Sequence, residues 1–182
     1  MQKPLITVVT SYYNDQDFLA DAISSVLNQT YTNFELIICD DCSKDNTRNI
    51  LTEYSKIDSR IKLHFNETNL GFKSNFENGV SFAQGDFIAF SDQDDIWENY
   101  KLQYAIEKIR TNDIYCSNAL LVDENNVSIN KTMMQYLAIK YVPEDNVKKA
   151  RHFLHGNICQ GATMLCKTDF IKKYLPDRKS VV

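Results

Sequence analysis

Two kinds of apolar pattern alternate along the first hundred residues. Short runs rich in β-branched and aromatic residues predict three buried strands, at residues 5–9, 34–39 and 87–90, and an alternating run at 61–65 predicts a half-buried strand nearer an edge of the sheet. Between the strands, apolar residues recur three and four positions apart, which predicts amphipathic helices. The apolar faces of these helices consist of Leu19, Ala22, Ile23, Val26 and Leu27, then Ile50, Leu51, Tyr54 and Ile57, then Phe72, Phe76, Val80 and Ala83.

The spacing of the strands indicates the architecture. The centres of the four strands, Ile6, Ile37, Leu63 and Ile88, are separated by 31, 26 and 25 residues, which are the lengths of β–α–β units. We therefore expect an α/β fold with a mostly parallel sheet and helices on both of its faces. Right-handed crossovers bring all carboxyl ends of the strands to one edge, where open α/β sheets bind ligands.

Polar residues near the helix ends predict where each helix starts and stops. We expect Asp15 or Asp17 to cap the first helix, Ser43 or Asp45 to cap the second, and Gly85 to follow the third. The second half of the chain has a weaker pattern, and residues 131–158 fit no single element. There we expect a helix at 102–109, a strand at 114–122, a hairpin turn at 123–126, a strand at 161–166 and a helix at 168–174.

Acidic residues follow the fourth strand directly. If the chain is still extended there, Asp92 and Asp94 point to the same side, and two like charges that close repel each other. A divalent cation relieves this repulsion, and Mg²⁺ typically binds one or two carboxylates together with substrate phosphates. The pattern thus predicts a metal–phosphate site, whereas taken alone it also fits a solvated acidic turn. With Ser11 and Asp41 at the ends of the first two strands, polar groups from three strands meet at one edge.

Composition and charge narrow the class of protein. The chain has 182 residues, 43% hydrophobic and 24% charged, and a net charge of −4, which argues against general nucleic-acid binding. No apolar run approaches the ~18 residues that span a bilayer, and the N-terminus does not resemble a signal peptide. From Lys140 onward there are 9 basic and 4 acidic residues, a balance of +5, which predicts contact with an anionic acceptor or membrane surface, or else a solvated face.

The cysteines favour a reducing compartment. Five cysteines, an odd number, fit free thiols in the cytoplasm. Cys39 and Cys42 match the spacing of a redox pair, but the two acidic residues between them disfavour the thiolate that such chemistry needs. A zinc site that combines this pair with His152 and His155 has an unusual spacing and is a weaker interpretation.

Five stretches of the chain together resemble one family in order and spacing. The sequence is similar to family 2 glycosyltransferases with a GT-A fold, and its Ser-Asp-Gln-Asp-Asp stretch resembles rhamnosyltransferase-like members. Residues 98–182 fit the acceptor-side half of the family only loosely. The stretches that carry the resemblance are residues 8–14, 24–30, 34–43, 69–71 and 85–97.

The resemblance implies roles for particular residues. Ser11 lies where the first strand meets the nucleotide, and Asp41 accepts a hydrogen bond from N3–H of a pyrimidine base, while Asp40 holds the loop or a helix end. Asp92 lies near the ribose or the metal, and Asp94 binds Mn²⁺ or Mg²⁺ that bridges the diphosphate. Lys73 either contacts the ribose or phosphate or is a solvated helix lysine. Trp97 is assigned to the core or to a sugar-facing wall, and Asp95 to the cap of the following helix.

The implied reaction is a metal-dependent, inverting sugar transfer. A UDP- or dTDP-linked sugar is the donor, and a saccharide or lipid-linked molecule is the acceptor, as in bacterial cell-surface polysaccharide synthesis. We expect a cytoplasmic protein, with contact at the inner face of the membrane. In such a reaction the metal offsets charge on the leaving nucleoside diphosphate, and a carboxylate deprotonates the acceptor hydroxyl.

The expected domain has two parts, and its catalytic base is expected outside both of them. We expect a single domain over 1–182, with a nucleotide-sugar half at 1–97 and a partial acceptor half at 98–182. The family's base lies beyond the helix at 168–174, and Asp177 is too early for that place, so the base is expected beyond Val182 and the domain is expected to be truncated. The alternative is a nucleotide-sugar-binding domain without catalysis.

Two other classes share part of the acidic pattern. A receiver-type phosphoacceptor would carry its acidic pair at the end of the first strand, where this chain has Ser11 to Asn14. An EF-hand would need a ligand and a glycine at the fifth and sixth loop positions, where this chain has Ile96 and Trp97. Neither pattern is complete.

Overall fold

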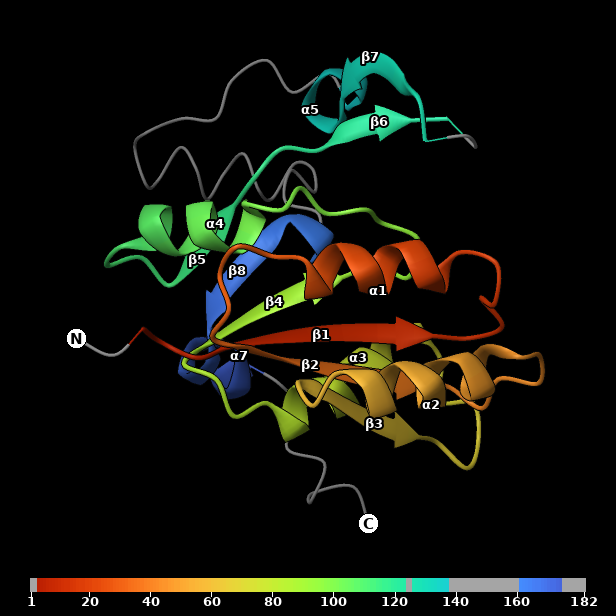
Figure 1. The fold of residues 1–182 in the computed structure, drawn as a ribbon. Coiled ribbons are helices and arrows are strands. Elements are labelled where there is room, and N and C mark those ends of the chain that lie inside the picture. Colours follow the sequence, from red (N-terminus) through yellow and green to blue (C-terminus); the bar gives the residue numbers. More distant parts are fainter. Residues whose placement is uncertain (1–2, 124–125, 138–160, 175–182) are drawn as a thin grey trace.

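A six-stranded sheet forms the centre of the molecule (Figure 1). The computed structural model describes residues 3–123, 126–137 and 161–174. The order of strands in the main sheet is β3-β2-β1-β4-β8-β5, and β6 and β7 form a separate two-stranded sheet. The strands are β1 (Ile6–Tyr12), β2 (Phe34–Asp40), β3 (Ile61–Phe65), β4 (Phe87–Ser91), β5 (Ile114–Cys116), β6 (Leu120–Val122), β7 (Ser128–Thr132) and β8 (Met164–Lys167).

The four N-terminal strands run parallel, and β1 lies between β2 and β4. The chain therefore winds from β1 outward to β2 and β3, and then crosses back to β4 on the other side. This reversal is the switch point at which open α/β sheets bind ligands. Strand β8 pairs antiparallel with both β4 and β5, so the later part of the chain extends the same sheet.

Helices cover both faces of the main sheet, as Figure 1 shows. Alternate residues of each strand point to opposite faces. Ile6, Val8 and Tyr12 pack with three helices on one face, and Val9 packs with two helices on the other. Each fully buried aliphatic side chain contributes about 1.5–3 kcal/mol. The first face holds α1 (Leu19–Leu27), α2 (Thr47–Ile57) and α4 (Lys101–Ile109), and the second holds α3 (Phe72–Phe82) and α7 (Thr168–Tyr174).

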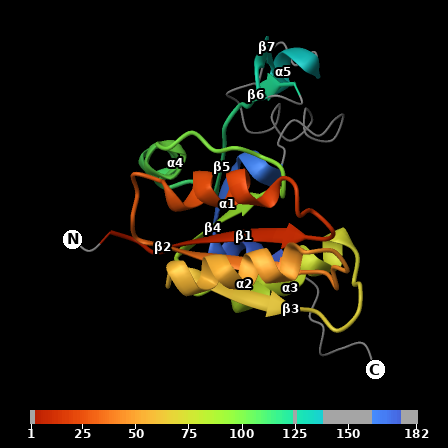
Figure 2. The ribbon, with the colours of Figure 1, turned by 45° about the vertical axis from the view of Figure 1, so that its right-hand side comes forward.

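The hairpin of β6 and β7, followed by α5 (Met133–Tyr136), lies apart from the main sheet in both views (Figures 1 and 2). Asp123 and Val127 bracket its turn, where the N–H of Asp123 donates to the carbonyl of Val127 at 2.9 Å. The predicted hairpin turn is confirmed. The short 3₁₀ helix η1 (Gly161–Thr163) leads back into β8.

The expected fold class is confirmed, and the helix caps are the main correction. Helix α1 begins after Phe18, and no side chain caps it, so neither Asp15 nor Asp17 is its cap. Helix α2 begins after Asn46; the Asp45 carboxylate accepts from the N–H of Thr47 but is not the N-cap residue. Ser43 lies too early to cap α2. Its Oγ and the Asp45 carboxylate accept from N–H groups of the loop after β1, and the Asp15 carboxylate accepts from Gln93.

Two predicted boundaries and one predicted cap in the later chain are also wrong. The apolar run at 114–122 is two strands, β5 and β6, that belong to different sheets. Residues 161–163 are η1, and the strand begins only at Met164. Helix α4 follows Tyr100, so Asp95 lies too early to cap it.

Gly85 is required for close packing and not as a helix cap. Helix α3 ends at Phe82, and its C-cap residue is Ala83, two residues before Gly85. A Cβ at Gly85 would lie 2.7 Å from the backbone nitrogen of Thr7 and 2.8 Å from the carbonyl oxygen of Leu5. The N–H of Gly85 donates to the Thr7 hydroxyl at 2.9 Å. A residue without a side chain therefore lets the chain enter β4 directly beside β1.

Membrane contact was predicted from the basic excess after Lys140. Within the described ranges, no helix is long and apolar enough to cross a bilayer. Most of the residues behind the basic excess lie outside the described residues, as do His152, His155 and Asp177. The membrane-contact prediction therefore stays a prediction.

Candidate functional site

The candidate site lies at the carboxyl ends of β1, β2 and β4. Thr10 of β1 is the partner of Ser91 of β4, so Ser11 and Asp92 follow at the same edge of the sheet. Ser11 is in turn the partner of Cys39 of β2, which places Asp41 two residues beyond that point. The three strand ends predicted to converge do meet at the switch point.

The loop after β4 is crowded with carboxylates. Burial, together with the charges of Asp95 and Asp94, raises the pKa of Asp92. Burial also raises the pKa of Asp95, and the charge of Asp94 adds to this. Asp15, which the sequence patterns pointed to only as a helix cap, joins the group from the loop after β1. Its carboxylate accepts from Gln93 Nε2 at 3.1 Å. The loop therefore concentrates negative charge at the switch point.

One cation lies beside these carboxylates. The side chain of Lys101, the first residue of α4, has its pKa lowered to about 8 by burial, while the charges of Asp95 and Asp92 oppose this shift. Its Nζ donates to the carbonyl oxygen of Ala162 at 2.6 Å and lies 4.2 Å from the ring centroid of Trp97. Sequence patterns did not mark Lys101, although a lysine at the start of an amphipathic helix beside an acidic loop was a usable signal.

At the end of β2, Asp41 holds the loop that follows β3. Asp41 is 3% exposed, and its carboxylate accepts three hydrogen bonds. Two come from backbone N–H groups, of Leu70 at 2.7 Å and Gly71 at 2.9 Å, and the third comes from Asn66 Nδ2 at 2.9 Å. These bonds explain the Asn-Leu-Gly stretch at 69–71, whose backbone folds onto the carboxylate.

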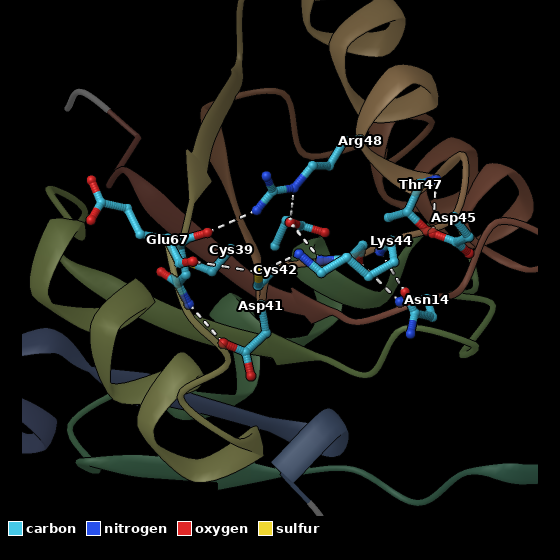
Figure 3. Close-up of polar contacts among 12 residues, drawn as sticks. Asn14, Cys39, Asp41, Cys42, Lys44, Asp45, Thr47, Arg48 and Glu67 are labelled. Atoms are coloured by element: carbon cyan, nitrogen blue, oxygen red, sulfur yellow. Dashed lines mark hydrogen bonds and ion pairs between the residues drawn. The ribbon is translucent and has the colours of Figure 1, made fainter.

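Asp40, the preceding residue, faces the other way. Its carboxylate is fully buried and pairs with Arg48 Nε at 2.5 Å, while it also accepts from the N–H of Ser43 at 3.2 Å (Figure 3). Arg48 continues to the carbonyl oxygen of Asn66 at 2.8 Å. Asp40 therefore holds the start of α2 and the adjacent loop, which is one of the roles predicted for it.

A buried amide links the strand ends. Asn75 of α3 is 0% exposed, and its Nδ2 donates to Ser11 Oγ at 2.6 Å and to the Cys39 carbonyl at 2.9 Å. Its Oδ1 accepts from Asn66 Nδ2 at 2.7 Å, and Asn66 in turn reaches Asp41. The chain of bonds thus runs from Ser11 to Asp41. Asn66 directly follows β3, just as Asp41 directly follows β2. This position at a strand end was the one sequence signal that could have marked Asn66 as a site residue.

We expect Asn75→Ala to destabilise the protein markedly. The substitution leaves Ser11 and the Cys39 carbonyl without their buried partner, and each unsatisfied buried group costs about 1–3 kcal/mol. Urea unfolding measures the change. Asn49→Ala, which removes an exposed asparagine bonded only to Asn46 Oδ1, is the matched control and should cost much less. Equal losses in the two variants would show that the buried network contributes nothing specific.

The loops after β1 and β2 are joined to each other (Figure 3). The N–H of Asn14 donates to Ser43 Oγ at 3.0 Å, and Asn14 Oδ1 accepts from the N–H of Lys44 at 2.8 Å. The N–H of Asp15 donates to Thr47 Oγ1 at 3.0 Å. Asn14 has a φ of 57°, a left-handed conformation that asparagine tolerates better than most residues. Two of the residues expected as helix caps take part in this junction, Ser43 through its hydroxyl and Asp15 through its N–H.

Helix α1 holds the far end of the acidic loop. Gln29 is 4% exposed; its Nε2 donates to the Glu98 carbonyl at 2.8 Å, and its Oε1 accepts from the N–H of Leu102 at 3.0 Å. Ser25 Oγ accepts from the N–H of Trp97 at 3.0 Å. The stretch at 24–30 that contributed to the resemblance therefore fixes the segment between the acidic loop and α4.

Two other candidates are placed differently. Lys73 lies in the first turn of α3 with an 88% exposed side chain, 3.9 Å from Glu77 Oε1, and its contact with a nucleotide stays a prediction. Cys39, Cys42 and Cys166 are free thiols, whereas Cys116 is disulfide-bonded, so the expectation of free thiols is wrong for Cys116. Burial raises the pKa of Cys39 to about 12, so this thiol is not a nucleophile at neutral pH. The structure thus argues against the redox pair. Trp97 is 4% exposed and belongs to the core.

The acidic loop fits a divalent cation that also binds phosphate. Among the described residues, no group of three or more His, Cys, Asp or Glu side chains is placed to hold a metal. Mg²⁺ typically needs only one or two carboxylates when a nucleotide supplies further oxygens. Asp92 and Asp94 offer such oxygens, and the pKa of Asp92 is raised first by burial and then by the charges of Asp95 and Asp94, which a cation would offset. The assignment of these ligands stays a prediction.

A family model described as "Glycosyl transferase family 2" matches residues 7–175. The chain belongs to this family. The glucosyltransferase WfgD of Escherichia coli is 40% identical over 129 residues, which are 70% of this chain and 50% of WfgD. WfgD is named UDP-Glc:alpha-D-GlcNAc-diphosphoundecaprenol beta-1,3-glucosyltransferase. The chain spans about half the length of the curated relatives it matches.

Solved structures agree with the fold. TarS 1–349 of S. aureus in complex with UDP-GlcNAc superposes with a TM-score of 0.67 at 23% identity, covering 92% of this chain and 46% of TarS. The mannosyltransferase PcManGT of Pyrobaculum calidifontis, with GDP-Man and Mn²⁺, gives a TM-score of 0.67 at 14% identity, covering 94% and 47%. These structures confirm the expected GT-A fold. The match to the family model confirms the expected family.

Proposed function

We propose that this chain is part of an enzyme that transfers a sugar from a nucleoside-diphosphate sugar to a hydroxyl of a saccharide or lipid-linked acceptor, with inversion and with a divalent metal. The observation that carries the proposal is the acidic loop after β4, which meets Ser11 and Asp41 at the switch point of the sheet. The process is cell-surface polysaccharide synthesis at the cytoplasmic side of the membrane.

The end of β2 provides for recognition of the base. A carboxylate offers about four lone-pair sites, and the neighbouring loop uses three of those on Asp41. The remaining site accepts N3–H of a pyrimidine, which makes UDP or dTDP the favoured carrier. Ser11 Oγ accepts from Asn75, so its own O–H is left to donate to the nucleotide. Lys73 contacts the ribose or phosphate once the donor is bound.

Carboxylates after the end of β4 bind the diphosphate of the donor through a metal ion. Asp92 and Asp94 hold Mn²⁺ or Mg²⁺, which offsets the negative charge that develops on the leaving diphosphate. Gln29 and Ser25 anchor the segment that follows the carboxylates, at Glu98, Leu102 and Trp97. This anchoring of one end of the loop favours a defined geometry over a solvated acidic turn.

The names of the similar proteins favour this choice of donor and acceptor. TarS is described in complex with UDP and with UDP-GlcNAc, and the name of WfgD gives a diphosphoundecaprenol-linked acceptor. A lipid-linked pyrophosphate acceptor also agrees with the basic excess after Lys140. The catalytic base is left open, because Asp177 and the residues around it lie outside the described residues.

Nucleotide-dependent melting tests the donor half of the proposal. With UDP or dTDP at about 100 times the dissociation constant and with Mn²⁺, stabilisation is about 2.7 kcal/mol. This corresponds to a rise in melting temperature of about 5–10 °C for a domain of this size. ADP, a purine nucleotide, is the control and should give a smaller rise. If no nucleoside diphosphate changes the melting temperature, the proposal fails.

Transfer itself needs a second measurement. The full-length protein is incubated with UDP- or dTDP-sugars and an undecaprenyl-diphosphate-linked saccharide, and the extended product is detected by mass spectrometry. Product that depends on Mn²⁺ or Mg²⁺ supports the enzyme. Donor binding with no product for any pair would favour a domain that only binds nucleotide sugars.

A further inference from the structure

We propose that Lys101 is a positioning residue for the acidic loop: its fixed charge offsets those of Asp92 and Asp95 and keeps the affinity for a divalent cation low until a nucleoside diphosphate binds. The inference rests on the proposed function and extends it with an order of binding. It concerns a residue that neither the resemblance nor the sequence patterns pointed to.

The side chain of Lys101 is held in place from two sides. Its Nζ donates to the Ala162 carbonyl at 2.6 Å, and it lies 4.2 Å from the ring centroid of the buried Trp97. Leu102, the next residue, is anchored through its N–H to Gln29. A lysine fixed in this way differs from an exposed one, which loses side-chain entropy when it pairs with a carboxylate and gains little.

The charge of Lys101 acts on the site from a short distance without closing it. Trp97, whose ring Lys101 contacts, follows Asp95 by two residues, and the N–H of Asp95 turns back to the carbonyl of Asp92, so the ammonium group lies beside the acidic loop. Yet among the described residues no ion pair of 4.0 Å or less joins Lys101 to any carboxylate. The acidic oxygens therefore stay available to a cation while Lys101 lowers the negative potential that attracts one.

A nucleoside diphosphate reverses the effect of Lys101. Its anionic oxygens supply ligands to the metal and also add negative charge beside Lys101, so the positive charge of the lysine attracts the nucleotide. Lys101 thus opposes binding of the cation alone and favours binding of the cation with the diphosphate. The hydrogen bond to the Ala162 carbonyl also links Lys101 to η1, which leads into β8 beside β4.

The test is the direction in which Lys101→Met changes two affinities, that for Mn²⁺ alone and that for UDP in saturating Mn²⁺. A unit charge and a divalent ion about 5–7 Å apart in a water-like dielectric change an equilibrium by about tenfold. We therefore expect Lys101→Met to bind Mn²⁺ alone about tenfold more tightly than the wild type. We also expect it to bind UDP in saturating Mn²⁺ several-fold more weakly. Both affinities are measured by calorimetry at pH 7, where Lys101 is charged in the wild type.

Three further variants separate charge from packing. Lys101→Gln keeps a donor for the Ala162 carbonyl but no charge, and should follow Lys101→Met in the affinity for Mn²⁺. Lys101→Arg keeps the charge and should follow the wild type. Lys108→Met is the matched control, since Lys108 is an exposed lysine of the same helix that lies 4.9 Å from the ring centroid of Tyr104.

The outcomes distinguish this inference from the proposed function. A purely structural role would weaken both affinities in Lys101→Met and in Lys101→Gln, and would overturn the inference. Unchanged binding of Mn²⁺ in both variants would overturn it as well. If Lys101→Met does not fold, Lys101→Gln supplies the same comparison. If the wild type binds Mn²⁺ but no nucleoside diphosphate, the proposed function fails. In that case, tighter binding of Mn²⁺ by Lys101→Met and Lys101→Gln would still support the role of Lys101 as a counter-charge to the carboxylates.

Discussion

Asp94→Ala is expected to abolish the Mn²⁺-dependent part of nucleoside-diphosphate binding and to leave the protein folded. Asp94 is exposed, and in the described part of the chain its carboxylate takes part in no hydrogen bond or ion pair. Surface substitutions of this kind change stability by less than about 0.5 kcal/mol. Removal of a carboxylate beside Asp92 also relieves repulsion, because Asp94 contributes to the raised pKa of Asp92.

The expected loss of affinity follows from the number of ligands. With only Asp92 and Asp94 as proposed ligands, loss of one removes half of the protein's share of the coordination shell. Since loss of outer-shell partners alone costs 10–100-fold in metal affinity, loss of a ligand should cost at least about 100-fold. Calorimetric titration with UDP and dTDP, with and without Mn²⁺, measures this. Asp21→Ala, an exposed carboxylate on α1, is the control. Equal metal-dependent affinity in wild type and Asp94→Ala would refute the metal assignment.

The sequence was sufficient to predict the parallel strands because their signal is local. The strand Phe34–Asp40 is buried along its whole length, so most of its residues are apolar, and Glu35 and Asp40 are the two exceptions. The 25–31-residue spacing then leaves few topologies, since crossovers are right-handed. The position of the site followed from the topology, because parallel strand ends share one edge.

The details of the site depend on contacts between distant residues, and local patterns do not contain them. Asp41 and its partners Asn66, Leu70 and Gly71 are 25 to 30 positions apart. Asp15 has a side chain that is favoured at helix caps and lies near a helix start, but its carboxylate accepts from the side chain of Gln93, 78 positions away. A polar residue near a helix start has several possible partners, and tertiary structure decides among them.

The split of the run at 114–122 has a similar cause. Ile114–Cys116 pairs with β8, and Leu120–Val122 pairs with β7, so two different partners divide one apolar stretch. Hydrophobic periodicity indicates that residues are extended, but not which strand each of them faces. The prediction of one long strand was therefore reasonable for the pattern and wrong for the fold.

Asp41→Asn is expected to lower both stability and pyrimidine-nucleotide affinity. An amide has one acceptor oxygen, whereas the Asp41 carboxylate uses Oδ1 for Asn66 and Leu70 and Oδ2 for Gly71. In either orientation the NH₂ group faces at least one N–H donor and loses that bond. A hydrogen bond to a charged group contributes about 1.5–3 kcal/mol, so the free energy of unfolding should fall by at least this amount. Urea unfolding measures the fall.

The affinity for the nucleotide separates the predicted role of Asp41 from its structural one. If Asp41 accepts N3–H of a pyrimidine, Asp41→Asn should weaken UDP by about 1.5–3 kcal/mol and weaken ADP much less. Asp40→Asn is the comparison: it disrupts the buried pair with Arg48 and so lowers stability, but it should leave the affinity for UDP near that of the wild type. A larger loss of UDP affinity in Asp40→Asn would reverse the assignment of the pair. Equal losses of UDP and ADP affinity in Asp41→Asn would refute recognition of the base by Asp41. Its role would then be the structural one of holding the loop through Leu70 and Gly71.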